Sequence, residues 1–149
     1  MDRIDIPVVG GTLASFRYGP AGSEPVVAVH GITANSREWI AVARALEGRA
    51  ALLALDLRGR AASRELPAPF GMEAYARDML AVMDHLSLER AVLVGHSLGA
   101  YAVARFAADH PERVAYHART DDYAQFRAAV RLGPVGEALQ VDLALLDLG

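Results

Sequence analysis

One serine of this chain stands in a sequence pattern that supports nucleophilic chemistry. Ser97 lies within the run Gly95-His96-Ser97-Leu98-Gly99, which has the form G-x-S-x-G and follows an apolar stretch of the chain. Between a buried strand and a helix, this pattern is typical of a tight turn that exposes the serine hydroxyl. A helix that begins at Leu98 would turn free N–H groups and the positive end of its dipole towards a developing oxyanion. The pattern therefore predicts a serine nucleophile at position 97.

Two further polar runs follow apolar stretches in the same way. The first is His30-Gly31-Ile32-Thr33, and the second is Asp56-Leu57-Arg58-Gly59-Arg60. If the three apolar stretches are parallel strands, these runs share the carboxyl edge of one sheet, which is where open α/β sheets bind ligands. There the backbone N–H of Ile32 can complete an oxyanion hole with that of Leu98. The residues that we expect to border a substrate at this edge are His30, Gly31 and His96.

The elements that must position these runs follow from hydrophobic periodicity and turn residues. Alternating apolar residues predict two strands joined by Gly10-Gly11, and short continuous apolar runs predict three buried parallel strands. Apolar residues at spacings of three and four predict the helices. The expected strands are 4–8, 12–18, 25–29, 50–57 and 91–94, and the expected helices are 36–47, 72–86 and 98–109. This alternation indicates the α/β class, with a mixed, mostly parallel sheet of about five or six strands flanked by helices.

In order and spacing, these motifs resemble the α/β-hydrolase fold superfamily in its serine-nucleophile, esterase- and lipase-like branch. The resemblance runs from Ile4 to Val114 and includes the run His110-Pro111-Glu112-Arg113-Val114. It implies an eight-stranded sheet, of which this chain would supply strands one to five, so that residues 1–114 form the N-terminal half of a hydrolase core. It also implies acyl transfer to Ser97, after which water attacks the acyl-enzyme. Serine at this position disfavours the dehalogenase and epoxide-hydrolase branches, which have aspartate there.

The residues after Val114 depart from the pattern of that family. A sixth strand normally follows at once, but the run from Ala115 to Asp121 does not have the composition of a strand. Residues 115–149 are therefore interpreted as a divergent segment, partly helical, that could be the remnant of a cap. Within it, the stretch 137–148 fits a helix or a replacement strand equally well. Without a sixth strand, residues 91–94 would form an exposed apolar edge through which two copies of the chain could pair as a homodimer.

The partners that a serine nucleophile needs are not evident. In this family the chain order is serine, acid, histidine, so both partners follow Ser97. His117 is the candidate base, although a helix of about twelve residues, roughly 18 Å long, would separate it from Ser97. Asp147 is the candidate acid if 137–148 is a strand. The sequence thus predicts an impaired serine hydrolase of ester-like acyl substrates. The alternatives are a non-catalytic binding or self-associating module, or a chain completed by a second copy.

Composition limits the remaining possibilities. The 149 residues carry a net charge of −3, and the fifteen basic residues are all arginines scattered among acids, without the positive stripe of a nucleic-acid-binding protein. No apolar run is long enough to cross a bilayer. The absence of cysteine excludes a thiolate nucleophile and a cysteine metal site, and we expect neither a cofactor nor a metal. These features favour a cytoplasmic protein with a small-molecule acyl substrate and with neither a nucleic-acid nor a membrane partner.

Overall fold

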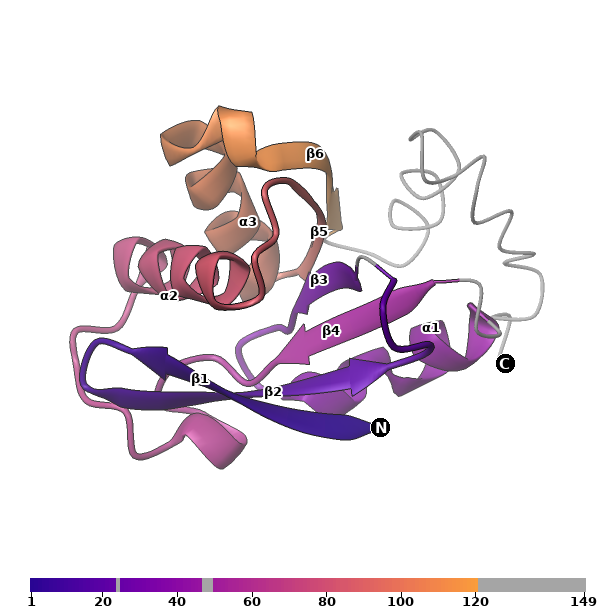
Figure 1. Ribbon diagram of the computed structural model, residues 1–149. Helices are drawn as coiled ribbons and strands as arrows, with labels where there is room; N and C mark the ends of the chain where they lie inside the picture. The colour runs from indigo at the N-terminus through magenta and orange to yellow at the C-terminus, as the bar shows by residue number, and fades with distance from the viewer. Residues whose placement is uncertain (24, 47–49, 121–149) are drawn as a thin grey trace.

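One mixed sheet with helices on both faces forms the part of the chain that the computed structural model describes, which is residues 1–23, 25–46 and 50–120 (Figure 1). Its strands are β1 (Asp2–Val8), β2 (Gly11–Tyr18), β3 (Pro25–Val29), β4 (Ala51–Leu55), β5 (Ala91–His96) and β6 (Val114–Thr120). The α-helices are α1 (Ile40–Ala45), α2 (Met72–His85) and α3 (Leu98–Asp109), and the 3-10 helices are η1 (Ser36–Trp39), η2 (Ala61–Ser63) and η3 (Pro111–Arg113). The predicted α/β class and the mostly parallel sheet are confirmed.

The strand order places the predicted motifs along one edge. The order is β1-β2-β4-β3-β5-β6, with β1 and β2 antiparallel and β4, β3, β5 and β6 parallel to one another. Val8 pairs with Gly11 across the first turn, where Gly10 has a φ of +90° that glycine adopts without a steric penalty. Because the carboxyl ends of parallel strands meet at one edge, the runs that follow β3, β4 and β5 stand side by side.

Alternate residues of the central strands point to opposite faces of the sheet and build two cores. On one face, Val27 of β3 belongs to a core that includes Met79 of α2 and Phe106 of α3. On the other face, Val26 of the same strand packs in a core with Trp39 of η1. Every residue of β3 and β4 is buried, which explains why these strands are continuously apolar and do not alternate.

The helix expected at 36–47 begins where predicted but is divided in two. The side chain of Asn35 accepts a hydrogen bond from the Arg37 N–H at 3.0 Å and so caps the start of η1. The chain then continues as α1 from Ile40 to Ala45. The helices α2 and α3 begin at Met72 and Leu98, as the sequence predicts.

The prediction that no strand follows the run at 110–114 is wrong. β6 pairs in parallel with β5, from Val114 opposite Ala91 to Thr120 opposite His96. The sheet therefore continues beyond the predicted boundary at residue 114. The place beside β5 that a replacement strand from 137–148 would take is occupied by β6, and 137–148 itself lies outside the described residues.

Two arginines bind the start of β6 to neighbouring segments. Arg113 donates from Nη2 to Asp84 Oδ1 at 2.8 Å and to the Leu88 carbonyl at 3.0 Å. Arg90 donates to the carbonyl of Val114 at 3.0 Å. These bonds fix the entry of β6 next to the loop before β5.

β6 also changes which residues form the edge of the sheet. Because β5 lies between β3 and β6, residues 91–94 are not an exposed edge, and that expectation is wrong. In the described part of the chain the edge strands are β1 and β6. A homodimer that pairs through a sheet edge stays a prediction, and among the described strands β1 and β6 are the ones that offer such an edge.

Candidate active site at the carboxyl edge of the sheet

Ser97 occupies a strained turn between β5 and α3. Its backbone angles, φ +51° and ψ −115°, lie in a region that residues with a side chain rarely adopt, at a cost of about 1–3 kcal/mol. The Ala100 N–H donates to the carbonyl of Ser97 at 2.9 Å, so the turn leads directly into the first turn of α3. The serine side chain therefore stands at the amino end of that helix, where unpaired N–H groups are expected.

The two glycines of the motif allow strand, turn and helix to approach one another closely. A Cβ on Gly95 would overlap the backbone of Gly99. A Cβ on Gly99 would overlap the carbonyl oxygens of Val29 and His30. Backbone atoms cannot swing aside as the end of a flexible side chain can, so glycine is required at both positions. This close packing holds the turn at Ser97 in its strained conformation.

The loop after β3 passes directly beside the turn. A Cβ built on Gly31 would lie 3.5 Å from Ser97 Cβ and 3.0 Å from His96 Nδ1. The structure thus brings together Gly31, His96 and Ser97, as the sequence predicted. Leu98 follows as the first residue of α3, and its N–H is one of those that no preceding turn of the helix can satisfy.

The carbonyl group of Gly31 is held by two donors, and this determines where the next N–H points. The carbonyl accepts from His30 Nδ1 at 2.7 Å and from the Ala34 N–H at 3.1 Å. In a planar trans peptide the N–H points opposite to the C=O. The N–H of Ile32 is therefore turned away from these donors. It forms no hydrogen bond with another described residue and is available to a ligand.

His30 supports this loop from the interior. Its side chain is fully buried, and Nε2 accepts the Leu57 N–H at 3.1 Å, so the ring proton resides on Nδ1 and is donated to Gly31. Burial lowers the pKa of His30 below its ordinary value of 6.5, against the opposite effects of the Gly31 carbonyl and the Asp56 charge. Both ring nitrogens are thus used to hold the loop after β3 to the turn after β4. A contact between His30 and substrate stays a prediction.

The turn after β4 is built on a buried carboxylate. Asp56 accepts the Ser36 N–H on Oδ1 at 2.7 Å and the Ala62 N–H on Oδ2 at 3.0 Å. Its side chain is almost completely buried. Two backbone donors replace the water that the carboxylate loses. Asp56 therefore ties the start of η1 to η2 and fixes the edge of the sheet next to β3.

Arg58 is a buried cation in the same turn. Its Nε and Nη2 donate to the two carboxylate oxygens of Asp78 in α2, at 2.8 and 2.7 Å. The guanidinium also donates to the carbonyls of Pro67 at 2.9 Å and Val9 at 2.7 Å. The hydrogen-bonded Asp78 carboxylate raises the pKa of Arg58. Arg58 thus joins the first hairpin, the loop before α2 and α2 itself.

Sequence reasoning missed one residue of the site, Glu38. Its Oε2 accepts the Gly31 N–H at 3.0 Å, and its Oε1 lies 2.5 Å from His96 Nδ1. The available signal was its position three residues after the cap Asn35, which is the acidic position of a capping box. That pattern predicts a local bond back to Asn35. In the structure the carboxylate contacts the candidate site.

The structure does not bring the predicted base and acid to Ser97 within the described residues. His117 lies in β6 opposite Leu93 of β5, in the middle of the strand and not at the edge where Ser97 stands. It is therefore a residue of the sheet. His110 packs its ring on Phe106, with ring centroids 5.1 Å apart. Asp147 lies outside the described residues, so its role and that of His117 stay predictions.

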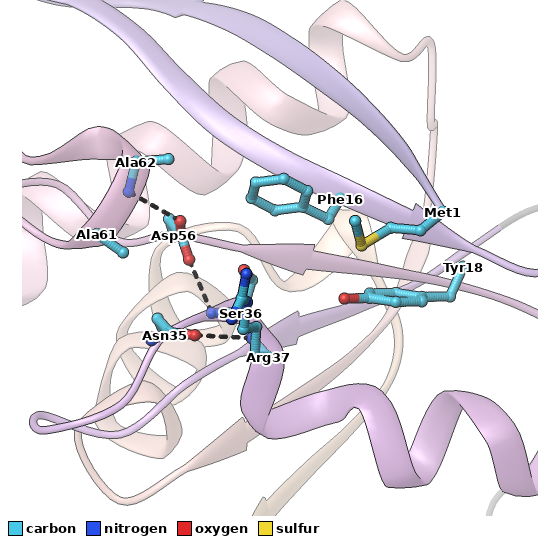
Figure 2. A pocket seen from close by; sticks show the side chains of 9 residues that line it. All are labelled: Met1, Phe16, Tyr18, Asn35, Ser36, Arg37, Asp56, Ala61 and Ala62. Carbon is cyan, nitrogen blue, oxygen red and sulfur yellow. Dashed lines mark hydrogen bonds between the residues drawn. The ribbon is translucent and has the colours of Figure 1, made fainter.

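A pocket of about 300 Å³ lies near the carboxyl end of β4 (Figure 2). It is lined by Met1, Phe16, Tyr18, Asn35, Ser36, Arg37, Asp56, Ala61 and Ala62. The Tyr18 hydroxyl is buried there without a hydrogen-bond partner among the described residues. Burial raises the pKa of Tyr18, while the charge of Arg37 acts against this. None of the predicted site residues lines this pocket, so it is separate from the turn at Ser97.

Within the described part of the chain, the structure contains neither a candidate metal site nor a helix that could span a membrane. Residues 1–23, 25–46 and 50–120 contain no group of three or more histidine, aspartate and glutamate side chains placed to hold a metal ion. No helix in these ranges is long and apolar enough to span a membrane.

Comparison with known proteins agrees with the fold and the motifs. A family model described as alpha/beta hydrolase fold matches residues 24–116. A putative carbamate hydrolase, RutD, of Caulobacter vibrioides is 38% identical over 117 residues, which are 77% of this chain and 44% of that protein. Lipase LipV of Mycobacterium tuberculosis is 34% identical over 99 residues, which are 66% of this chain and 37% of the lipase.

Solved structures give the same result. A thermophilic esterase from Thermogutta terrifontis superposes with a TM-score of 0.68 at 29% identity, over 83% of this chain and 49% of the esterase. A variant of a putative epoxide hydrolase from Pseudomonas aeruginosa has a TM-score of 0.73 at 31% identity, over 81% of this chain and 41% of that one. The chain therefore belongs to the α/β-hydrolase superfamily. It spans less than half the length of the curated relatives named above.

Proposed function

We propose that this protein is a serine hydrolase of small, ester-like acyl substrates, with Ser97 as its nucleophile and with impaired turnover. The observation that carries the proposal is the strained conformation of Ser97 at the start of α3. Strain of this kind gathers at active sites, where the surrounding structure maintains it. Gly95 and Gly99 provide that support here.

The proposed reaction is acyl transfer in two steps. The Ser97 hydroxyl gives up its proton to solvent water as Oγ forms a bond to the substrate carbonyl carbon, and the carbonyl π electrons move to oxygen. The resulting oxyanion accepts hydrogen bonds from the N–H groups of Ile32 and Leu98. It collapses as the bond to the leaving group breaks, and the leaving group takes a proton from water. A second water then attacks the acyl carbon, releases the acid and returns a proton to Ser97 Oγ. Removing one such donor from a protease lowers kcat by about 10²–10³, so these two N–H groups would account for much of the rate.

The proposed impairment follows from the histidines. His30 has both ring nitrogens bonded to backbone, and His96 faces Glu38 with Nδ1. None of the hydrogen bonds among the described side chains joins a histidine to Ser97, and on this ground we propose that Ser97 lacks a base within them. In proteases, loss of a triad member leaves roughly 10³–10⁴-fold catalysis over water from the oxyanion hole and from binding. We expect residual activity of that kind unless a base comes from outside these residues.

The relatives support the substrate class. The names carbamate hydrolase, lipase and esterase each denote attack on a carbonyl carbon, which is the reaction of a serine nucleophile with oxyanion donors. Epoxide hydrolases have the same fold, but the serine at position 97 fits acyl chemistry. The particular acyl group depends on residues beyond those that form this edge of the sheet.

A fluorophosphonate probe tests the proposal directly. Purified protein and its Ser97→Ala variant are treated with the probe, and labelling is measured by intact mass. The proposal predicts one adduct that forms slowly on the wild-type protein and none on the variant. Equal labelling of both proteins, or no labelling of a protein that is folded by circular dichroism, would show that the turn is retained as architecture only. The alternative of a non-catalytic module would then replace the proposal.

A further inference from the structure

One carboxylate contacts both segments that carry the proposed oxyanion donors. Glu38 accepts the Gly31 N–H at 3.0 Å, and its other oxygen lies 2.5 Å from His96 Nδ1. Gly31 directly precedes Ile32, and His96 directly precedes Ser97. A single side chain on η1 thus links the loop after β3 to the turn after β5.

We propose that Glu38 is a positioning residue, which holds the Ile32 N–H at a fixed distance from Ser97. The inference rests on the proposed function, because acyl chemistry is what gives that distance a consequence. Glu38 itself contacts neither the substrate nor the reacting atoms in this proposal. It acts through the backbone of Gly31 and through the ring of His96.

The contacts of Glu38 are directed away from its own helix. In a capping box, Glu38 would bond to the N–H of Asn35, but the carboxylate is bonded to Gly31 instead. A carboxylate that accepts a backbone N–H makes a charge-assisted bond, roughly twice as strong as a neutral one. Only 24% of the Glu38 side chain is exposed, so solvent weakens this bond less than it would at an open surface.

His96 supplies the second contact. Its Nδ1 is buried and makes no well-aligned hydrogen bond within the described residues, and Glu38 is the acid beside it. The pair is therefore a charge contact when His96 is protonated. A methyl group on Gly31 would press on the same ring nitrogen. The loop, the carboxylate and the imidazole consequently form one packed unit.

The rest of the loop does not depend on Glu38, which makes the inference testable in a folded protein. The carbonyl of Gly31 is bonded to His30 and Ala34, and neither of these bonds involves Glu38. The Glu38→Ala variant should therefore fold and lose one side of the support of Gly31. The Glu38→Gln variant keeps an amide oxygen that can accept the Gly31 N–H, and it should restore part of the effect.

The experiment combines amide exchange with labelling. Hydrogen exchange of the Gly31 amide is followed by NMR, and the rate constant of fluorophosphonate labelling of Ser97 is measured in the same proteins. For Glu38→Ala we expect faster exchange confined to this loop and labelling slower by on the order of tenfold, with Glu38→Gln in between. Glu65→Gln is the matched control, since that acid is 90% exposed, and it should change neither quantity.

The outcomes separate this inference from the proposed function. Labelling of Glu38→Ala at the wild-type rate would overturn the positioning role, whatever the exchange rates. If even the wild-type protein is not labelled, the proposed function fails and exchange alone decides about Glu38. Faster exchange at Gly31 in Glu38→Ala would then still support the link. Unchanged exchange would overturn it.

Discussion

Two corners of the same sheet edge are built differently. The β3–β4 corner contains His30, Asp56 and Arg58, whose side chains are buried and whose hydrogen bonds run to backbone or to an opposite charge. The β5 corner contains His96 and Ser97, which are both partly exposed. There the backbone is strained at Ser97, and His96 Nδ1 has no well-aligned hydrogen bond in the described part of the chain.

The difference shows how stability and function are divided along this edge. Buried polar groups that are fully bonded stiffen a corner, and the loss of one partner leaves the other unsatisfied at a cost of about 1–3 kcal/mol or more. A nucleophile needs the opposite, a polar group whose partner is the substrate. The β3–β4 corner therefore serves as the rigid frame against which the β5 corner can keep its strain.

The largest expected effect on stability comes from breaking the buried Arg58–Asp78 pair, which belongs to the β3–β4 corner. Replacing Arg58 by Met removes the cation from a pair whose side chains are 1% and 2% exposed and leaves Asp78 buried with no counter-charge. We expect the free energy of unfolding to fall by about 3–5 kcal/mol, as measured by urea denaturation. The double variant Arg58→Met, Asp78→Leu should recover part of this loss, because no unpaired charge remains. A single variant within 1 kcal/mol of wild type would refute the role of Arg58.

A smaller change in the free energy of unfolding should accompany the protonation of His30 at low pH. Its pKa is lowered in the folded protein by burial, so the neutral ring is favoured by folding. This contribution is complete above pH 6.5, the ordinary pKa, and is lost as the pH falls from 6.5 towards the folded pKa. The limiting slope is about 1.4 kcal/mol per pH unit, and we expect the free energy of unfolding to fall as the pH is lowered from 7 to 5.5.

Urea denaturation at several pH values measures this loss, with two variants for comparison. His30→Asn should be less stable and should show a smaller dependence on pH than wild type, whereas His85→Asn, at an exposed position, should keep the wild-type slope. Direct NMR titration of the His30 ring gives the same answer without a variant. A pKa at or above 6.5 would contradict the interpretation.

The smallest expected effect is a gain in stability, and it comes from a substitution at Ser97 in the β5 corner. Glycine adopts the backbone angles of Ser97 more easily than any residue with a Cβ. We therefore expect Ser97→Gly to raise the free energy of unfolding by about 1 kcal/mol, after subtraction of the greater entropy of glycine in the unfolded chain. Ser97→Ala keeps the Cβ and should not stabilise. Equal stability of the two variants in thermal or urea unfolding would mean that the turn stores no strain.

Glu38 and β6 show where sequence patterns stopped being informative. The acid three residues after Asn35 is explained by a local capping pattern, and only the folded loop reveals its bond to Gly31. The strand β6 carries polar residues and one histidine in its second half, and it pairs with β5 along its length, with Arg113 and Arg90 bonded near its start. Both features depend on contacts between residues far apart in the chain, which periodicity does not encode.

The sequence by itself determined the elements and the edge. Continuous apolar runs identified β3, β4 and β5, and the glycines around Ser97 identified the turn, because burial on both faces and crowding at a turn each restrict residue type locally. Tertiary structure alone decided which polar groups form hydrogen bonds within the protein and which stay available to a ligand. His30 became a support for the loop because Leu57 lies against its ring, and the Ile32 N–H was left available because the preceding carbonyl is held on its other side. Such pairings depend on distances between separate segments, and those exist only once the chain has folded.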